Sequence, residues 1–286
     1  MNKIYQFFNE RWAIGTDEYR RMAVVLLQAI KSGQIEAASR LLDSNPVRAY
    51  AADPYLADRY ELSDTDIPAG SVGVITLDGP LYSWETLRLE QYIDAAMRND
   101  RIAGVVLWIN GPGGMISRVD IVAEKIANAP KPVAAYVAGV MASAHFWIGS
   151  AAGRTFVASP MSVVGSVGVM VTYQSLKGFY QQNGIDFREI YPDTADLKNK
   201  WFRDIEEQGD ETIIKQRLAD DHLFMSQAVA RYLHVNYDPQ LPLFRGSTFT
   251  GADAVAAGYI DQIGTLEDAA RWVLAQDTVK KISTQH

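Results

Sequence analysis

Short apolar runs alternate with amphipathic stretches between about residue 70 and residue 175. The apolar runs predict strands, and the stretches in which apolar residues recur every three or four positions predict helices. The strands are expected over 72–77, 103–109, 133–137, 155–158 and 167–172, and the helices over 85–99, 116–129 and 142–151. This alternation predicts an α/β fold with mainly parallel strands and interleaved helices.

The flanks of this region have different patterns. Apolar residues recur at helical spacing within residues 1–45, whereas residues 45–69 are polar and carry three prolines, as in a linker or an extended arm. A long charged helix is expected over 204–234 and a compact helical end over 250–276. We therefore predict a helical N-terminal segment with a linker over 1–60, and one larger domain over 61–286.

Composition excludes several classes of function. The 286 residues are 48% hydrophobic and 21% charged, which is typical of a globular protein. Lys and Arg number 27 against 34 Asp and Glu, and the net charge of −7 without a basic run argues against nucleic acid as a partner. The chain has no cysteine, and its four histidines match no zinc pattern. We expect neither a metal nor a cofactor.

The stretch 133–153 is long enough to cross a membrane and contains no Asp, Glu, Lys or Arg. It also contains Gly139, Ser143 and His145, and a buried strand followed by a buried helix accounts for it better. The N-terminus lacks the apolar core of a secretory signal. The sequence therefore predicts a cytoplasmic protein without a membrane anchor.

Two segments carry candidate chemistry. Gly111-Pro112-Gly113-Gly114 follows a predicted strand, and its backbone N–H groups suit a phosphate or a tetrahedral oxyanion, although a plain strand-to-helix turn has the same pattern. It is neither a P-loop nor a dinucleotide-binding motif. Ser143 stands where an apolar strand gives way to a helix, as an exposed nucleophile would. A helix N-cap, or a buried serine bonded to a carbonyl, is the alternative.

Four ordered strings across residues 71–275 resemble the signal peptide peptidase A family of serine proteases, which shares a superfamily with the Clp protease and crotonase. The strings are VGVITLDGPL, WINGPGG, MASAHFWIGSAAGRTFVASPMSVVGSVGV and FRGSTFTGADAVAAGYIDQIGTLEDA. The resemblance implies a Clp protease/crotonase-like fold and a serine peptidase. The family strings D/N-S-P-G-G and A-S-G-G-Y have become N-G-P-G-G and A-S-A-H-F here, which alters the pocket.

The resemblance also implies roles for individual residues. A Ser-His-Asp triad is not expected. In Clp-type relatives the base is a histidine about two dozen residues after the serine, and the matching segment here, VVGSVGVMV, contains none. His145 is not an alternative base, because a helix would turn it away from Ser143. The family uses a lysine, whose pKa burial can lower from about 10.4. Lys198 is the expected base and Lys200 the alternative. Ser143 is then the nucleophile, and Gly114 and Ala144 are the oxyanion donors. Gly113, Ser166 and His145 are candidate supporting residues, with Ser166 a candidate to orient the lysine.

The expected role is that of a phage or prophage peptidase in head maturation. Such an enzyme would cleave capsid or scaffold protein in the cytoplasm of a bacterial host, as a homo-oligomer. Three alternatives stay open: an inactive structural homologue that serves as an assembly factor, a cytoplasmic peptidase that degrades signal peptides, and a crotonase-like acyl-CoA enzyme. The last needs neither Ser143 nor Lys198.

Overall fold

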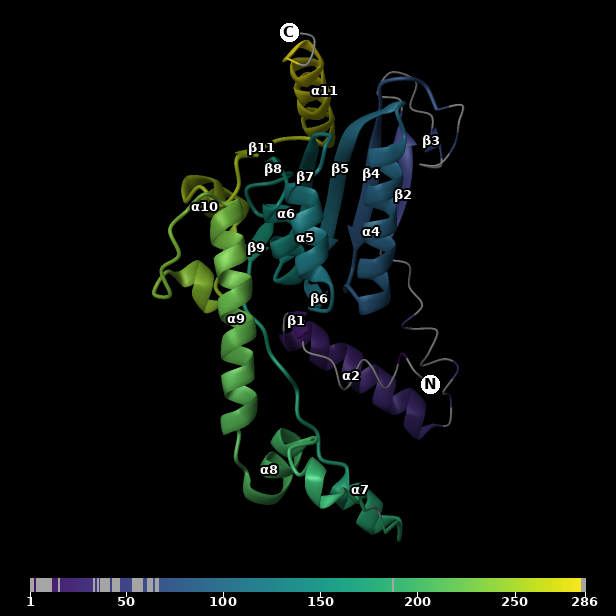
Figure 1. Cartoon of the computed structure of the whole chain (residues 1–286), viewed down its shortest axis with the longest axis vertical. Coiled ribbons are helices and arrows are strands. Elements are labelled where there is room, and N and C mark those ends of the chain that lie inside the picture. Colours follow the sequence, from purple (N-terminus) through teal and green to yellow (C-terminus); the bar gives the residue numbers. More distant parts are fainter. Residues whose placement is uncertain are drawn as a thin grey trace.

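Figure 1 shows the computed structural model of the whole chain. It describes residues 67–283 except 187, together with residues 3, 12–14, 16–32, 34, 36, 42, 47–52, 59–60 and 64. A twisted sheet forms the body, helices cover both of its faces, and an arm projects from one end.

The main sheet is mainly parallel. Its strands follow the order β10-β9-β7-β5-β4-β2-β3, and β8 lies between β7 and β11. The pairs β4–β5, β5–β7, β7–β8 and β7–β9 are parallel. The strands are β2 (Val47–Ala52), β3 (Arg59–Tyr60), β4 (Ser71–Asp78), β5 (Ile102–Gly111), β7 (Val133–Ala142), β8 (Arg154–Val157), β9 (Val163–Gly165), β10 (Thr248–Thr250) and β11 (Gln262–Ile263). The predicted α/β architecture is confirmed.

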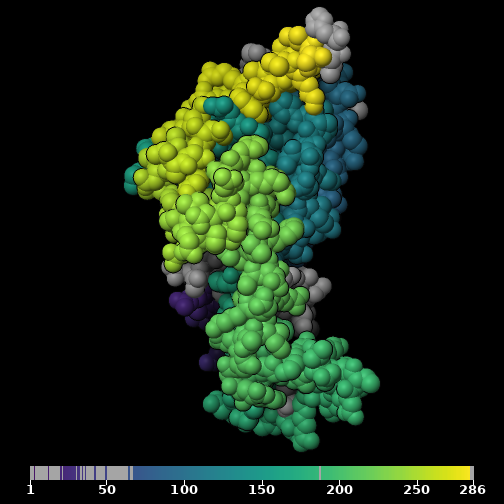
Figure 2. Space-filling view, turned by 60° about the vertical axis from the view of Figure 1, so that its left-hand side comes forward, coloured from purple at the N-terminus to yellow at the C-terminus, as the bar shows by residue number. Residues whose placement is uncertain are grey.

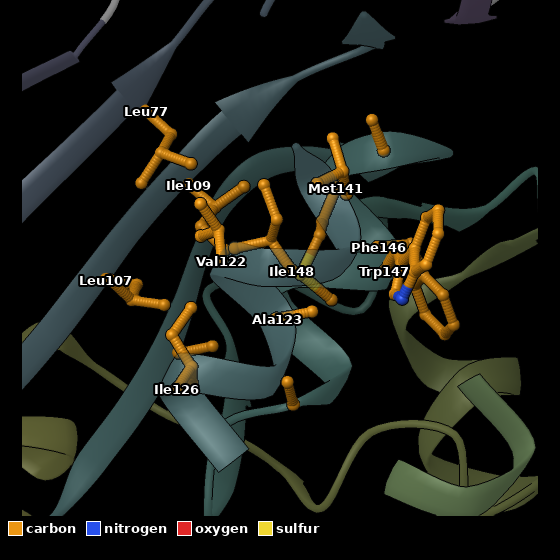
Figure 3. Close-up of a cluster of buried hydrophobic side chains, with 14 of the residues drawn as sticks. Leu77, Leu107, Ile109, Val122, Ala123, Ile126, Met141, Phe146, Trp147 and Ile148 are labelled. Atoms are coloured by element: carbon orange, nitrogen blue, oxygen red, sulfur yellow. The ribbon is translucent and has the colours of Figure 1, made fainter. Parts of the chain in front are cut away.

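Helices pack on both faces of the sheet, because successive side chains of β5 point to opposite faces. Leu107 and Ile109 face the larger core, where Val122, Ile126 and Ile148 meet them (Figure 3). Val106 points to the other face, against α11. The helices of the body are α4 (Ser83–Arg98), α5 (Val119–Ala127), α6 (Ala144–Ser150), α9 (Thr212–Tyr232), α10 (Gly251–Ala256) and α11 (Leu266–Ser283), with 3-10 helix η2 (Pro242–Arg245) before β10.

Two predicted elements differ from the structure. The strand expected over 167–172 is absent, because Gly165 and Ser166 both adopt positive φ and end β9, after which the chain leaves the sheet. The helix expected over 204–234 is broken where Gly209 adopts φ 69°. It forms α8 (Lys200–Gln208) and α9 instead. The apolar stretch 133–153 is a strand followed by a helix, as expected.

The N-terminal region contains strands as well as a helix. The predicted helical character is confirmed by α2 (Thr16–Lys31). In the stretch expected to be a linker or arm, β2 pairs antiparallel with β4 and extends the sheet. A short strand, β1 (Trp12–Ile14), pairs with β6 (Gly113–Met115) in a separate ribbon. The N-terminal region is thus attached to the body at two places.

The arm consists of α7 (Lys177–Gln182), η1 (Asp193–Ala195) and α8, and α9 leads back from it to the body. In the space-filling view it forms the separate lower lobe (Figure 2). No helix within the described part of the chain is both long and apolar enough to span a bilayer. The same residues contain no cluster of three or more His, Asp or Glu side chains able to hold a metal.

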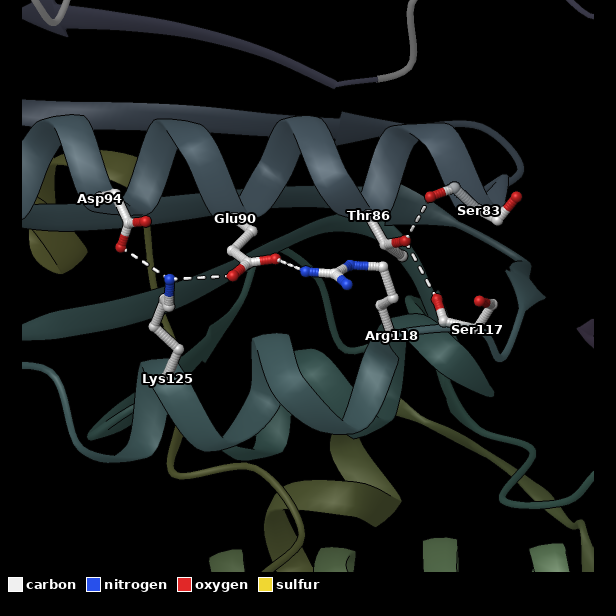
Figure 4. A network of polar contacts seen from close by, with 7 residues as sticks. All are labelled: Ser83, Thr86, Glu90, Asp94, Ser117, Arg118 and Lys125. Carbon is white, nitrogen blue, oxygen red and sulfur yellow. Dashed lines mark hydrogen bonds and ion pairs between the residues drawn. The ribbon is translucent and has the colours of Figure 1, made fainter.

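A polar network ties α4 to α5, the helix that follows β6 (Figure 4). Glu90 pairs with Arg118 and accepts from Lys125 Nζ at 3.1 Å, and the same Nζ lies 2.8 Å from Asp94 Oδ1. The Thr86 hydroxyl lies 3.0 Å from the Ser117 carbonyl. Because these contacts reach residues 117 and 118, they fix the segment directly behind the glycine turn.

Candidate active site

Ser143 stands between β7 and α6 in a strained backbone conformation. Its φ of 58° and ψ of −116° are unfavourable for any residue with a Cβ, and such outliers concentrate at functional sites. The Ser143 N–H donates to the Gly165 carbonyl at 2.7 Å, and the hydroxyl donates to the Gly168 carbonyl at 3.2 Å. The strand β9 and the segment after it therefore hold the serine in place.

The structure bears on the alternative explanations for this serine. Ser143 occupies the N-cap position of α6, but its side chain makes no capping hydrogen bond. It is 1% exposed and bonded to a carbonyl, as a structural serine would be. A structural serine has no need of the unfavourable φ and ψ, however, and that strain favours a functional role.

The glycine turn lies next to the start of α6. Gly113 has φ 108°, which only glycine adopts easily. A Cβ on Gly114 would lie 1.9 Å from the Leu81 carbonyl oxygen. Leu81 donates to the Gly113 carbonyl at 2.9 Å and accepts from the Met115 N–H at 2.7 Å. Since neighbouring residues of a strand direct their amides to opposite edges, the Gly114 N–H faces away from Leu81.

His145 connects the turn to α6. The ring is completely buried, and its Nδ1 accepts from the Gly113 N–H at 3.0 Å. Burial lowers the pKa of His145 to about 3, so the ring is neutral and carries its proton on Nε2. The Gly113 N–H is therefore engaged, which leaves the N–H groups of Gly114 and Ala144 as the candidate oxyanion donors. Ala144 begins α6, so its N–H has no acceptor within the helix.

Ser166 lies behind Ser143, next to the Gly165 carbonyl that accepts from the serine. Its φ is 56°, and its N–H donates to the Ser247 carbonyl at 2.8 Å. These backbone contacts brace the end of β9.

The single chain does not bring either candidate lysine to Ser143. Lys198 is exposed between η1 and α8, on the arm, whereas Ser143 lies in the body at the start of α6 (Figure 1). Lys200 also lies on the arm, where its Nζ is 2.7 Å from both carboxylate oxygens of the buried Asp204. Lys198 makes no ion pair with any residue that the structure describes.

A groove of about 630 Å³ lies elsewhere, between α5 and α9. Trp147 and Phe224 form part of its wall, and Asp120, Glu124 and Arg231 line it with charge. Ser143 does not line it. This groove is therefore separate from the candidate nucleophile.

Comparison with known proteins places the chain in a family. The model of peptidase family S49 matches residues 125–280, which is more than half of the sequence. The chain belongs to peptidase family S49. The resemblance to signal peptide peptidases is thereby confirmed at the level of the family.

The relatives that this S49 chain matches are distant and longer. "Putative protease MJ0651" of Methanocaldococcus jannaschii is 29% identical over 181 residues, which cover 63% of this chain and 58% of the relative. "Head-tail preconnector protein GP5" of Enterobacteria phage P21 is 27% identical over 179 residues, covering 62% and 35%. "Serine protease SPPA, chloroplastic" of Arabidopsis thaliana is 26% identical over 186 residues, covering 64% and 27%. The chain thus spans less than two thirds of each of these relatives.

Among solved structures, the S49 chain is similar to an enoyl-CoA hydratase/isomerase family member. The TM-score is 0.39 at 17% sequence identity, and the match covers 75% of this chain and 74% of the other.

Proposed function

We propose that this S49 chain is a serine endopeptidase that forms an acyl-enzyme at Ser143. The observation that carries the proposal is the strained serine beside the glycine turn. Strain of this kind costs on the order of 1–3 kcal/mol and persists where the surrounding structure imposes it. In a chain of a peptidase family, a nucleophile held at a fixed angle to backbone donors is the most economical reason for it.

The proposed chemistry is acyl transfer. Ser143 Oγ attacks the scissile carbonyl while a neutral Lys198 takes the hydroxyl proton. The N–H groups of Gly114 and Ala144 hold the oxyanion, and one such donor contributes about 3 kcal/mol of transition-state stabilisation. The tetrahedral intermediate then expels the amine, which receives the proton from the lysine. Water attacks the resulting ester and releases the second product, with the same lysine as general base.

We assign the lysine to a neighbouring copy of the chain, so that the active enzyme is a homo-oligomer. Within one chain Lys198 and Ser143 lie on different parts of the molecule. The arm that carries Lys198 also exposes large apolar side chains, which a second copy would bury: Phe179 is 56%, Ile190 90% and Leu197 73% exposed. Lys200 is the weaker choice because Asp204 already engages it.

For the biological role we propose phage or prophage head maturation, with capsid or scaffold protein as the substrate. The support is the relative from phage P21, which is named a head-tail preconnector protein. A catalytically inactive assembly factor is the second candidate. It is favoured by the 1% exposure of Ser143 and the bond from its hydroxyl to the Gly168 carbonyl.

The test is covalent labelling with a fluorophosphonate, followed by intact mass measurement between pH 6 and 10. We expect one adduct on the wild type and none on Ser143→Ala or Lys198→Ala. Lys200→Ala is the matched control, since it removes the neighbouring lysine on the same arm, and it should label like the wild type. A folded wild type that acquires no adduct would favour the inactive assembly factor, and labelling that survives Lys198→Ala but not Lys200→Ala would move the base to Lys200.

A further inference from the structure

The strand β1 is bonded along both of its edges by the segments that surround Ser143. On one edge it runs antiparallel to β6, with Trp12 opposite Met115, Ala13 opposite Gly114 and Ile14 opposite Gly113. On the other edge the Trp12 N–H donates to the Met170 carbonyl at 2.9 Å, and the Met170 N–H donates to the Trp12 carbonyl at 2.8 Å. The three residues of β1 thus lie between the glycine turn and the segment after β9.

The register aligns this strand with the proposed catalytic groups. Leu81 already engages the Gly113 carbonyl and the Met115 N–H, so the N–H of Gly114 faces β1 and pairs with Ala13. That N–H is one of the two proposed oxyanion donors. Met170 lies two residues beyond Gly168, whose carbonyl accepts from the Ser143 hydroxyl. The backbone of Ala13 therefore lies where the peptide group of a bound substrate would meet the donor.

We propose that residues 12–14 occupy the peptide-binding slot of the enzyme as an intramolecular inhibitor, and that substrates bind there as an extended strand antiparallel to β6. This inference rests on the proposed peptidase function. Backbone pairing along a strand is sequence-tolerant and captures extended polypeptide, which gives the substrate class as unfolded or extended protein segments.

The side chain of Trp12 anchors the strand in the slot. It is 0% exposed and packs in a small cluster with Tyr82, Met115 and Leu26, with the Tyr82 ring edge-on at 6.2 Å between centroids. Ser143 is itself only 1% exposed. A nucleophile that must reach a protein substrate needs an open approach, and removal of β1 would expose the edge of β6 beside it.

The test uses a disulfide between Trp12→Cys and Met115→Cys in the full-length chain. The two residues are directly opposite, and because the backbone of Trp12 bonds to Met170 they form a non-hydrogen-bonded pair, in which side chains lie closest. The chain has no other cysteine to interfere. In the reduced variant we expect fluorophosphonate labelling and hydrolysis of fluorescein-labelled casein. Oxidation should slow casein hydrolysis by at least about tenfold, and reductant should restore it.

The single variants Trp12→Cys and Met115→Cys are the controls, and oxidation should leave their rates unchanged. Casein hydrolysis at the same rate in the cross-linked and reduced protein would overturn the inhibitor role, and failure to form the cross-link would overturn the placement of β1. Phosphonate labelling separates this from the proposed function. A variant that cross-links on oxidation but is not labelled by the phosphonate even when reduced would refute the peptidase while leaving the position of the strand intact.

Discussion

At the scale of single residues, two departures from the family strings form one packing exchange. The family strings have serine at the position of Gly111 and glycine at the position of His145. A Cβ on Gly111 would lie 2.5 Å from His145 Cε1 and 2.6 Å from the Gly79 carbonyl oxygen, so the ring fills the space that the missing side chain leaves. The sequence shows two unrelated anomalies, and the structure shows that the imidazole occupies part of the space that a side chain at position 111 would need.

A double-mutant cycle tests this exchange. We expect Gly111→Ser alone to lower the free energy of unfolding by about 1–3 kcal/mol, because the new side chain overlaps the imidazole. In the background of His145→Gly the same substitution should cost at least about 1 kcal/mol less. Chemical denaturation of the four proteins measures the coupling. Additive effects would mean that the two positions are independent.

His145 also predicts how stability depends on pH. Its pKa is about 3 in the folded state and about 6.5 in the unfolded chain, so between these values the unfolded state binds the extra proton. The contribution of the neutral His145 to the free energy of unfolding is therefore present in full above the unfolded pKa. It is lost as pH falls, by about 2 kcal/mol at pH 5. His145→Asn keeps an acceptor for the Gly113 N–H but does not titrate.

Denaturation of both proteins at pH 8 and pH 5 provides the measurement. The wild type should lose about 2 kcal/mol more than His145→Asn between the two conditions. Equal losses in the two proteins would show that the imidazole remains hydrated.

At the scale of elements, the short strand β6 positions the Gly114 N–H, a proposed oxyanion donor. It is held by Leu81 on one edge and presents the Gly114 N–H on the other. The network between α4 and α5 fixes the chain directly behind it. The position of the Gly114 N–H, the proposed oxyanion donor, therefore depends on contacts from Leu81, β1 and α4, which are distant from β6 in sequence.

Alanine substitutions of two glycines test this dependence. The Cβ of Gly114→Ala would overlap the Leu81 carbonyl oxygen and displace β6, so we expect fluorophosphonate labelling to slow by about a hundredfold or more. Gly168→Ala is the matched control, because a Cβ there meets no atom within 4 Å. Circular dichroism verifies that both variants fold. Rapid labelling of folded Gly114→Ala would remove Gly114 from the oxyanion hole.

The elements also show what the sequence can and cannot predict. The strands over 72–77 and 103–109 follow from their continuous apolar runs, which are buried along almost their whole length, and the helix between them follows from apolar residues at helical spacing. The end of β9 depends on positive φ at Ser166, and β1 is too short to show a period. Ser143 and the glycine turn are recognisable as strings, whereas the contact from His145 to Gly113 exists only in three dimensions.

At the scale of the whole molecule, the separation of the arm from the body predicts sharing of the active site between copies. Neither Ser143→Ala nor Lys198→Ala should take up the phosphonate by itself. Co-expression of the two variants should restore part of the labelling, because a mixed oligomer contains sites with an intact serine and an intact lysine. Lys198→Ala mixed with the double variant is the control and should stay unlabelled. Absence of rescue in assembled mixtures would place both groups in one chain.

The pairing of β1 with β6 also affects the concentration at which a substrate can compete for the slot. A tethered strand competes with substrates at an effective concentration on the order of millimolar, which does not change when the protein is diluted. Short peptides that bind weakly would therefore rarely displace it. A protein substrate that also binds a second surface of the enzyme would have a high local concentration of its own at the slot. The rate of turnover would then depend on that second contact rather than on the concentration of cleavable sequence in solution.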